Sequence, residues 1–169
     1  MEIDVKEGPG VISMSQHEEL LRRALVLSAS CRGVRYYGVG CLICASDGQV
    51  VASGYTGEIA YADSLGTSLP HAEETAILKA RREGKHLQGC TLYSTLEPCS
   101  QRKSGRTACV DLILETGISR VVYGAREPFD PELGIVCRGH ARLAGAGLEV
   151  IHLAGLEQEC LRAVKAAGK

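Results

Sequence analysis

The residues most able to do chemistry in this 169-residue chain are His71, Cys99 and Cys109. Each is expected at the start of a helix or in the loop before one. The unpaired N–H groups and the dipole of a helix N-terminus lower the pKa of a thiol and keep an imidazole neutral. One imidazole and two thiolates bind zinc and leave the fourth tetrahedral position to water, whose pKa the metal lowers to about 7. These residues therefore predict a zinc site that generates a hydroxide nucleophile.

Glu73 follows His71 by two residues, so both side chains are expected in one pocket, on different sides of the helix start. Glu73 is expected beside the metal and not on it. There its carboxylate could take a proton from zinc-bound water, pass it to a ring nitrogen and help ammonia leave. A glutamate is also common in the first turn of a helix for reasons of charge alone. Together with the ligand set, Glu73 predicts a hydrolytic deaminase.

The motifs around these residues resemble those of the zinc deaminases, whose signature is His-x-Glu followed by Pro-Cys-x-x-Cys. Nine residues separate Cys99 from Cys109 here instead of two. A longer loop with a Gly-Arg/Lys-Thr element is typical of the riboflavin-pathway pyrimidine deaminases of the cytidine-deaminase-like superfamily. Thr95-Leu96-Glu97-Pro98-Cys99 and Gly105-Arg106-Thr107 are similar to that family, and the likeness extends to about Val150. The chain is expected to resemble this family without its reductase domain.

The resemblance implies a substrate, a cofactor and a set of substrate contacts. The substrate would be an aminopyrimidine bearing a ribosyl phosphate, and the cofactor would be Zn2+. The sugar-phosphate would lie near Arg106 and Thr107, assisted by Lys103, and the base near the backbone of Ala72. Tyr36 stands where the family usually has an asparagine near the substrate, and its ring could stack on a base or its hydroxyl could donate. The resemblance also implies a homodimer or higher homo-oligomer.

Three alternatives remain open. The enzyme could act on another base or nucleoside, such as cytidine, dCMP, guanine or a secondary metabolite. A non-catalytic zinc-stabilised binding domain would require four protein ligands and no open position, whereas the motifs supply three ligands and a carboxylate. A nucleic-acid editing deaminase is disfavoured by the long loop between the cysteines. It is also disfavoured by a net charge of -1 and a pI near 6.5, which provide no broad basic surface for phosphates.

The hydrophobic pattern predicts the elements that position these residues. Ser15, with Glu18 three residues on, is expected to cap a helix that ends at Cys31-Arg32-Gly33. Asp47-Gly48 predicts a tight hairpin between two strands, 39–45 and 50–55. After Pro70 the elements alternate, which predicts parallel strands covered by helices: helix 71–82, strand 91–94, helix 107–116, strand 120–123, helix 138–146, strand 148–153 and helix 156–166. With the resemblance, this predicts an α/β fold of three αβα layers around a mixed sheet of about five strands.

Composition indicates one domain in a reducing compartment. With 45% hydrophobic residues the chain can bury a core, so residues 15–169 are expected to form the deaminase domain after a flexible arm, residues 1–14. The eight cysteines are irregularly spaced and follow no secretory leader, which favours free or metal-bound thiols and a cytoplasmic location. No apolar run approaches the roughly 20 residues of a membrane span. The remaining cysteines and histidines are expected to be structural or exposed, and the Glu127-Pro128-Phe129-Asp130 loop to shape the pocket mouth.

Overall fold

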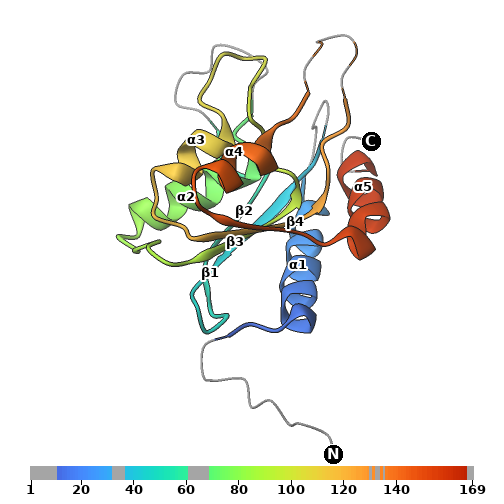
Figure 1. Cartoon of the computed structure of the whole chain (residues 1–169). Helices are drawn as coiled ribbons and strands as arrows, with labels where there is room; N and C mark the ends of the chain where they lie inside the picture. The colour runs from blue at the N-terminus through green and yellow to red at the C-terminus, as the bar shows by residue number, and fades with distance from the viewer. Residues whose placement is uncertain are drawn as a thin grey trace, which may run out of the picture.

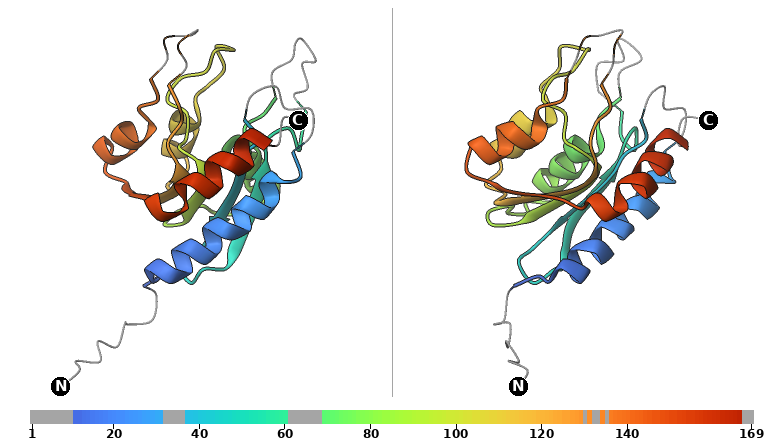
Figure 2. Two further views of the ribbon diagram at one scale, coloured as in Figure 1. Left: turned by 90° about the vertical axis from the view of Figure 1, so that its right-hand side faces the viewer. Right: turned by 45° about the vertical axis from the view of Figure 1, so that its right-hand side comes forward.

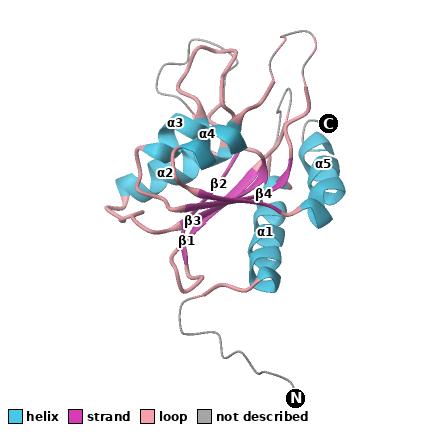
Figure 3. Cartoon of the chain, in the orientation of Figure 1, coloured by secondary structure: helices cyan, strands magenta, loops and turns pink. Residues whose placement is uncertain are grey.

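The computed structural model describes residues 11–31, 37–60, 69–129, 131, 134 and 136–166. Its centre is a five-stranded sheet in the order β2-β1-β3-β4-β5. Helices α1 and α5 contact each other on one face, and α2, α3 and α4 cover the other (Figure 1 and Figure 2). The predicted three-layer αβα architecture is therefore confirmed, and Figure 3 separates its helical and strand layers. The elements are α1 (Met14–Ser28), β1 (Gly40–Cys44), β2 (Val50–Tyr55), α2 (Ala72–Arg82), β3 (Thr91–Leu96), α3 (Cys109–Leu114), β4 (Arg120–Ala125), α4 (Gly139–Gly145), β5 (Glu149–His152), η1 (Ala154–Leu156) and α5 (Glu157–Ala166).

The sheet combines antiparallel and parallel pairing. β1 and β2 form the predicted antiparallel hairpin, and Gly48 supplies the positive φ of 85° that its turn requires. β1 also pairs antiparallel with β3, whereas β3, β4 and β5 run parallel. The carboxyl ends of β3 and β4 therefore lie at the same edge of the sheet. Ligands in such sheets commonly bind at this edge, where the loops after the strands meet.

Both β3 and β4 extend two residues beyond their predicted ends at Ser94 and Tyr123. The additional residues continue the parallel ladder, in which Leu96 pairs with Ala125. Every residue of β3 is buried, so no polar alternation marks where the strand stops. The extension carries the chain directly into the Glu97-Pro98-Cys99 motif.

The N-cap of helix α1 lies two residues before the predicted cap, Ser15. Ser13 is the N-cap: its hydroxyl accepts from the backbone N–H of Gln16 at 3.3 Å. The Gln16 side chain accepts from the Ser13 N–H at 2.8 Å, completing a capping box with glutamine in place of the expected Glu18. Ser13 takes this role because its backbone is extended, while Ser15 already lies inside the helix. The helix ends at Ser28, before the predicted stop.

The histidines and cysteines outside the motifs mostly serve the core. His17 is buried, and its Nδ1 lies 2.8 Å from the Tyr93 hydroxyl, while burial lowers the pKa of this imidazole. His140 pairs with the Tyr123 hydroxyl at 2.9 Å, and His152 stacks on the same tyrosine ring. All eight cysteines are free thiols, as expected. In the described part of the chain, no helix combines the length and apolar character needed to cross a membrane.

Helix α4 packs closely against the segment that carries Cys99. A Cβ added to Gly139, the first residue of α4, would lie 2.0 Å from the carbonyl oxygen of Pro98. This contact is with backbone, which cannot rotate away. Only glycine therefore lets the start of α4 approach the Pro98-Cys99 segment this closely.

Replacing Gly139 with alanine is expected to destabilise the protein by about 1–3 kcal/mol, because the added methyl overlaps the Pro98 carbonyl. The free energy of unfolding in urea measures this effect. Gly145→Ala is the matched control, since it lies in the same helix with nothing within 4 Å of the added Cβ. The control is expected to be neutral or stabilising by up to about 1 kcal/mol. Equal effects of the two substitutions would contradict the close approach at Gly139.

Candidate active site

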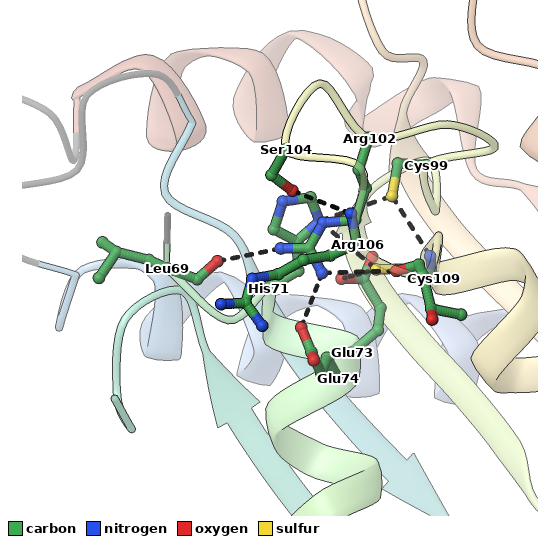
Figure 4. A network of polar contacts seen from close by, with 10 residues as sticks. Leu69, His71, Glu73, Glu74, Cys99, Arg102, Ser104, Arg106 and Cys109 are labelled. Atoms are coloured by element: carbon green, nitrogen blue, oxygen red, sulfur yellow. Dashed lines mark hydrogen bonds and ion pairs between the residues drawn. The ribbon is translucent and has the colours of Figure 1, made fainter. Parts of the chain in front are cut away.

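His71 lies immediately before α2, where it is the N-cap residue with an extended backbone. Its side chain does not cap the helix, and this leaves the imidazole free to turn toward the two cysteines. Nδ1 of His71 lies 3.5 Å from Sγ of Cys99 and 3.4 Å from Sγ of Cys109 (Figure 4). Residues from three segments of the chain thus meet at one imidazole nitrogen.

Cys99 and Cys109 are brought together by the loop that joins β3 to α3. Cys109 opens α3, and its backbone N–H donates to Sγ of Cys99 at 3.3 Å. The next N–H, of Val110, donates to the Cys99 carbonyl at 3.2 Å. Cys99 therefore occupies the N-terminal end of α3, where unpaired N–H groups stabilise a thiolate. Helix α3 starts two residues later than predicted because Ala108 is still extended.

The three side chains form a cluster suited to zinc. The donor atoms of His71, Cys99 and Cys109 all lie within 4.8 Å of one another. The Cys109 thiol, the His71 imidazole and the Cys109 N–H together lower the pKa of Cys99 to about 4. Burial by itself lowers the pKa of His71, but pairing with Cys99 outweighs it and raises that pKa. Among the described residues, no fourth histidine, cysteine or carboxylate joins this cluster, so the donor set fits an open zinc site.

Glu73 lies beside the cluster and is almost completely buried, with 3% of its surface exposed. One carboxylate oxygen, Oε1, accepts a hydrogen bond from the Ser94 hydroxyl at 3.0 Å. The other, Oε2, lies 3.5 Å from Sγ of Cys109. Burial raises the pKa of Glu73, partly offset by the nearby His71. The carboxylate is thus held at the donor cluster, with a pKa above the ordinary value for a glutamate.

The predicted substrate contacts differ in their exposure. Ala72 is fully buried at the first position of α2. In the loop between the cysteines, Lys103 and Thr107 are exposed and Arg106 is half-buried. Tyr36 lies outside the described residues. The predicted contacts that the structure describes therefore belong to two segments, the start of α2 and the loop before α3.

The structure adds residues that the sequence motifs do not reveal. Ser94 precedes the Thr-Leu-Glu-Pro-Cys motif and contacts Glu73 only because β3 runs beside the start of α2. Arg102 stands among other loop cations, yet it alone of them is buried. Burial raises the pKa of Glu127 to about 7, although a hydrogen bond with Cys137 acts in the opposite direction. The charges of Cys99, His71 and Glu73 also influence this pKa. Of the loop expected to shape the pocket mouth, Glu127 is half-buried, Phe129 is exposed and Asp130 is not described.

The fold and the donor cluster define a class of protein. Residues 14–125 match the family model of the cytidine and deoxycytidylate deaminase zinc-binding region. This match covers more than half of the chain, so the protein belongs to that family. The predicted zinc cofactor is confirmed by the family and by the fit of the His71, Cys99 and Cys109 donors. The roles of the individual residues stay predictions.

Three relatives narrow the comparison. The diaminohydroxyphosphoribosylamino-pyrimidine deaminase of Schizosaccharomyces pombe is 36% identical over 149 residues, which cover 86% of this chain and 34% of that protein. The Thermotoga maritima diaminohydroxyphosphoribosylaminopyrimidine deaminase/5-amino-6-(5-phosphoribosylamino)uracil reductase superposes with a TM-score of 0.71 at 32% identity, covering 89% of this chain and 39% of that one. The cytosine deaminase of Candida albicans is 33% identical over 73% of this chain and 69% of that protein. The expected resemblance to riboflavin-pathway pyrimidine deaminases is confirmed, and the chain spans about a third of the curated relative from S. pombe.

Proposed function

We propose that this protein catalyses the hydrolytic deamination of an aminopyrimidine, replacing an exocyclic amine with oxygen and releasing ammonia. The observation that carries the proposal is the meeting of three metal donors within 4.8 Å beside the buried carboxylate of Glu73. His71, Cys99 and Cys109 would hold the zinc ion. When bound, zinc would lower the pKa of a coordinated water to about 7 and make it nucleophilic at neutral pH.

Glu73 is the proton carrier in this proposal. Its Oε2 lies at the donor cluster, while the Ser94 hydroxyl holds Oε1 and fixes the orientation of the carboxylate. Glu73 takes a proton from the attacking water and gives it to a ring nitrogen of the substrate. It then assists proton transfer to the departing amine, so that water and substrate yield the carbonyl product and ammonia. The raised pKa of Glu73 suits a group that must both accept and release a proton.

The substrate class that we favour is a ribosylaminopyrimidine phosphate of the riboflavin-pathway type. The S. pombe and T. maritima relatives carry names that specify such a substrate. The loop cations Arg106 and Lys103, with Thr107, would bind the sugar-phosphate, and the backbone at Ala72 would bind the base. Two cations suffice for one phosphate, so this assignment is compatible with a net charge of -1.

Deamination of a free base is the second candidate. The cytosine deaminase relative is covered over 69% of its length, about twice the share of the S. pombe protein. The printed name of that relative specifies a free base, cytosine. A free base would need the zinc cluster, Glu73 and the backbone at Ala72, but it would not need the loop cations.

The experiment that tests the proposal is a screen of the zinc-loaded protein against pyrimidine and purine bases, nucleosides and nucleotides. Ammonia release and the mass change of the substrate are the readouts. We expect turnover of at least one aminopyrimidine, with the ribosyl phosphate compound preferred. Preference for cytosine would support the second candidate. Zinc binding without turnover of any compound would instead support a non-catalytic zinc-stabilised domain.

We also propose that the protein functions as a homo-oligomer in a reducing compartment such as the cytoplasm. The eight free thiols support the reducing compartment, since none of them is used in a disulfide. The family resemblance supports the oligomer, because neighbouring subunits often complete the site in such enzymes. Light scattering of the zinc-loaded protein would give the number of subunits.

A further inference from the structure

Arg102 is a buried cation in the loop between Cys99 and Cys109. Only 3% of its side-chain surface is exposed, although its neighbours Gln101 and Lys103 are exposed. Its Nη1 lies 2.8 Å from Oε2 of Glu74, whose side chain is 14% exposed. A charge is buried at this depth only when the surrounding groups compensate for its lost hydration. The ion pair with Glu74 provides that compensation.

The same guanidinium also reaches two backbone carbonyls. Nη2 donates to the Leu69 carbonyl at 3.1 Å, and Nη1 donates to the Thr107 carbonyl at 3.5 Å (Figure 4). Leu69 lies two residues before His71, Glu74 directly follows Glu73, and Thr107 lies two residues before Cys109. One planar side chain therefore joins the loop that leads to Cys109 to the segment at the start of α2 that carries His71 and Glu73.

Arg102 does not suit a role as a phosphate ligand. Its charge is already paired with Glu74, and its donors point at carbonyls of its own chain. The guanidinium therefore holds segments of its own chain together.

We propose that Arg102 is a positioning residue that preorganises the zinc site by tying the inter-cysteine loop to the start of α2. The inference rests on the proposed function, since it takes His71, Cys99 and Cys109 as the metal ligands. Nine residues separate the cysteines, and α3 contains only six residues. The segment between the cysteines therefore needs a contact such as that of Arg102 to fix its conformation. Ordering such a loop costs conformational entropy, which Arg102 offsets before the metal arrives.

The test compares zinc affinities, measured by chelator competition, of variants at Arg102 and Glu74. Arg102→Met/Glu74→Met removes the tie without leaving an unpaired charge, and we expect it to weaken zinc binding about 10- to 100-fold. Glu74→Gln keeps the guanidinium on the Leu69 and Thr107 carbonyls, so its zinc affinity is expected to fall by less than about tenfold. Arg102→Lys keeps the charge but not the planar guanidinium, and its zinc affinity is expected to lie between those of the other two variants. This single variant keeps the test usable if the double variant does not fold.

Arg142→Met is the matched control. Arg142 also donates to a carbonyl of this loop, that of Ser100 at 3.0 Å, but its side chain is 41% exposed. We expect its zinc affinity to stay within about twofold of the wild type, since exposed contacts contribute little. The visible absorption of the cobalt-loaded proteins provides a second readout, because it reports ligand geometry. That spectrum should change for the Arg102 variants and not for Arg142→Met.

Two results would overturn the inference while leaving the proposed function intact. One is a double variant that binds zinc within about twofold of the wild type. The other is a raised KM that persists at saturating zinc with an unchanged kcat, which would mean that Arg102 contacts the substrate. Under the inference, saturating zinc restores kcat and KM is unaffected. Failure of the wild-type protein itself to bind zinc or to deaminate any compound would instead overturn the proposed function.

Discussion

Replacing Glu73 with glutamine is expected to lower kcat by about 10²–10⁴-fold while zinc remains bound. The amide keeps the size of the side chain and can still accept from the Ser94 hydroxyl, which lies 3.0 Å from Oε1. It cannot carry a proton from water to the ring nitrogen. Because Glu73 is not a member of the donor cluster, the metal content measured by elemental analysis should be unchanged.

Glu83→Gln provides the control for this prediction. Glu83 is the C-cap residue of α2, so it lies at the opposite end of the helix that begins beside Glu73. Its substitution changes the same functional group and should leave both kcat and zinc content at wild-type values. Full activity of Glu73→Gln would show that another group moves the proton.

Removing zinc with a chelator is expected to abolish activity and lower the melting temperature, and added Zn2+ should restore both. A ligand present at about 1,000 times its Kd stabilises the folded state by about 4 kcal/mol, so the shift in melting temperature should be large.

Zinc affinity is expected to depend on pH. The hydrogen bond with Cys99 and burial raise the pKa of Cys109, so zinc must displace a proton there. At lower pH, protons compete more strongly with zinc for the Cys109 thiolate. We therefore expect zinc affinity to fall about tenfold or more per pH unit, as measured by chelator competition at several pH values.

Substitution of single cysteines separates the ligand role from general thiol chemistry. Cys109→Ser is expected to lose zinc and activity together. Cys137→Ser is the control: its thiol contacts the Pro98 carbonyl at 3.5 Å but does not belong to the donor cluster. It should keep zinc and most of its activity. Zinc retention by Cys109→Ser would contradict the proposed ligand set.

The order and type of the helices and strands follow from local patterns in the chain. The Asp47-Gly48 turn predicts a hairpin, and the alternation after Pro70 predicts parallel strands, because both signals act over a few residues. Boundaries were less predictable. Ser13 and Ser15 have the same capping chemistry, and only the backbone conformation of Ser13 decides between them. The buried ends of β3 and β4 carry no polar alternation that would mark where the strands stop.

The proposed metal donors and the neighbouring carboxylate could be predicted from the sequence because each belongs to a short motif with a definite chemistry. His71 and Glu73 are two residues apart, and Cys99 follows Glu97-Pro98 directly. The sequence by itself thus predicted the class of reaction that we propose. The sequence analysis also selected the loop cations Lys103 and Arg106 as substrate contacts. Nothing in the spacing shows that Arg102, in the same loop, is the cation that is buried.

The tertiary structure decided which polar groups support this chemistry. The Ser94 hydroxyl meets Glu73 only after β3 is placed against α2, and Arg102 meets Glu74 and Leu69 across about 30 residues of chain. Such contacts depend on burial and on the packing of segments distant in sequence, and no local pattern encodes them. The residues proposed to react could therefore be identified from the sequence, while the residues that hold them in place could be identified only from the fold.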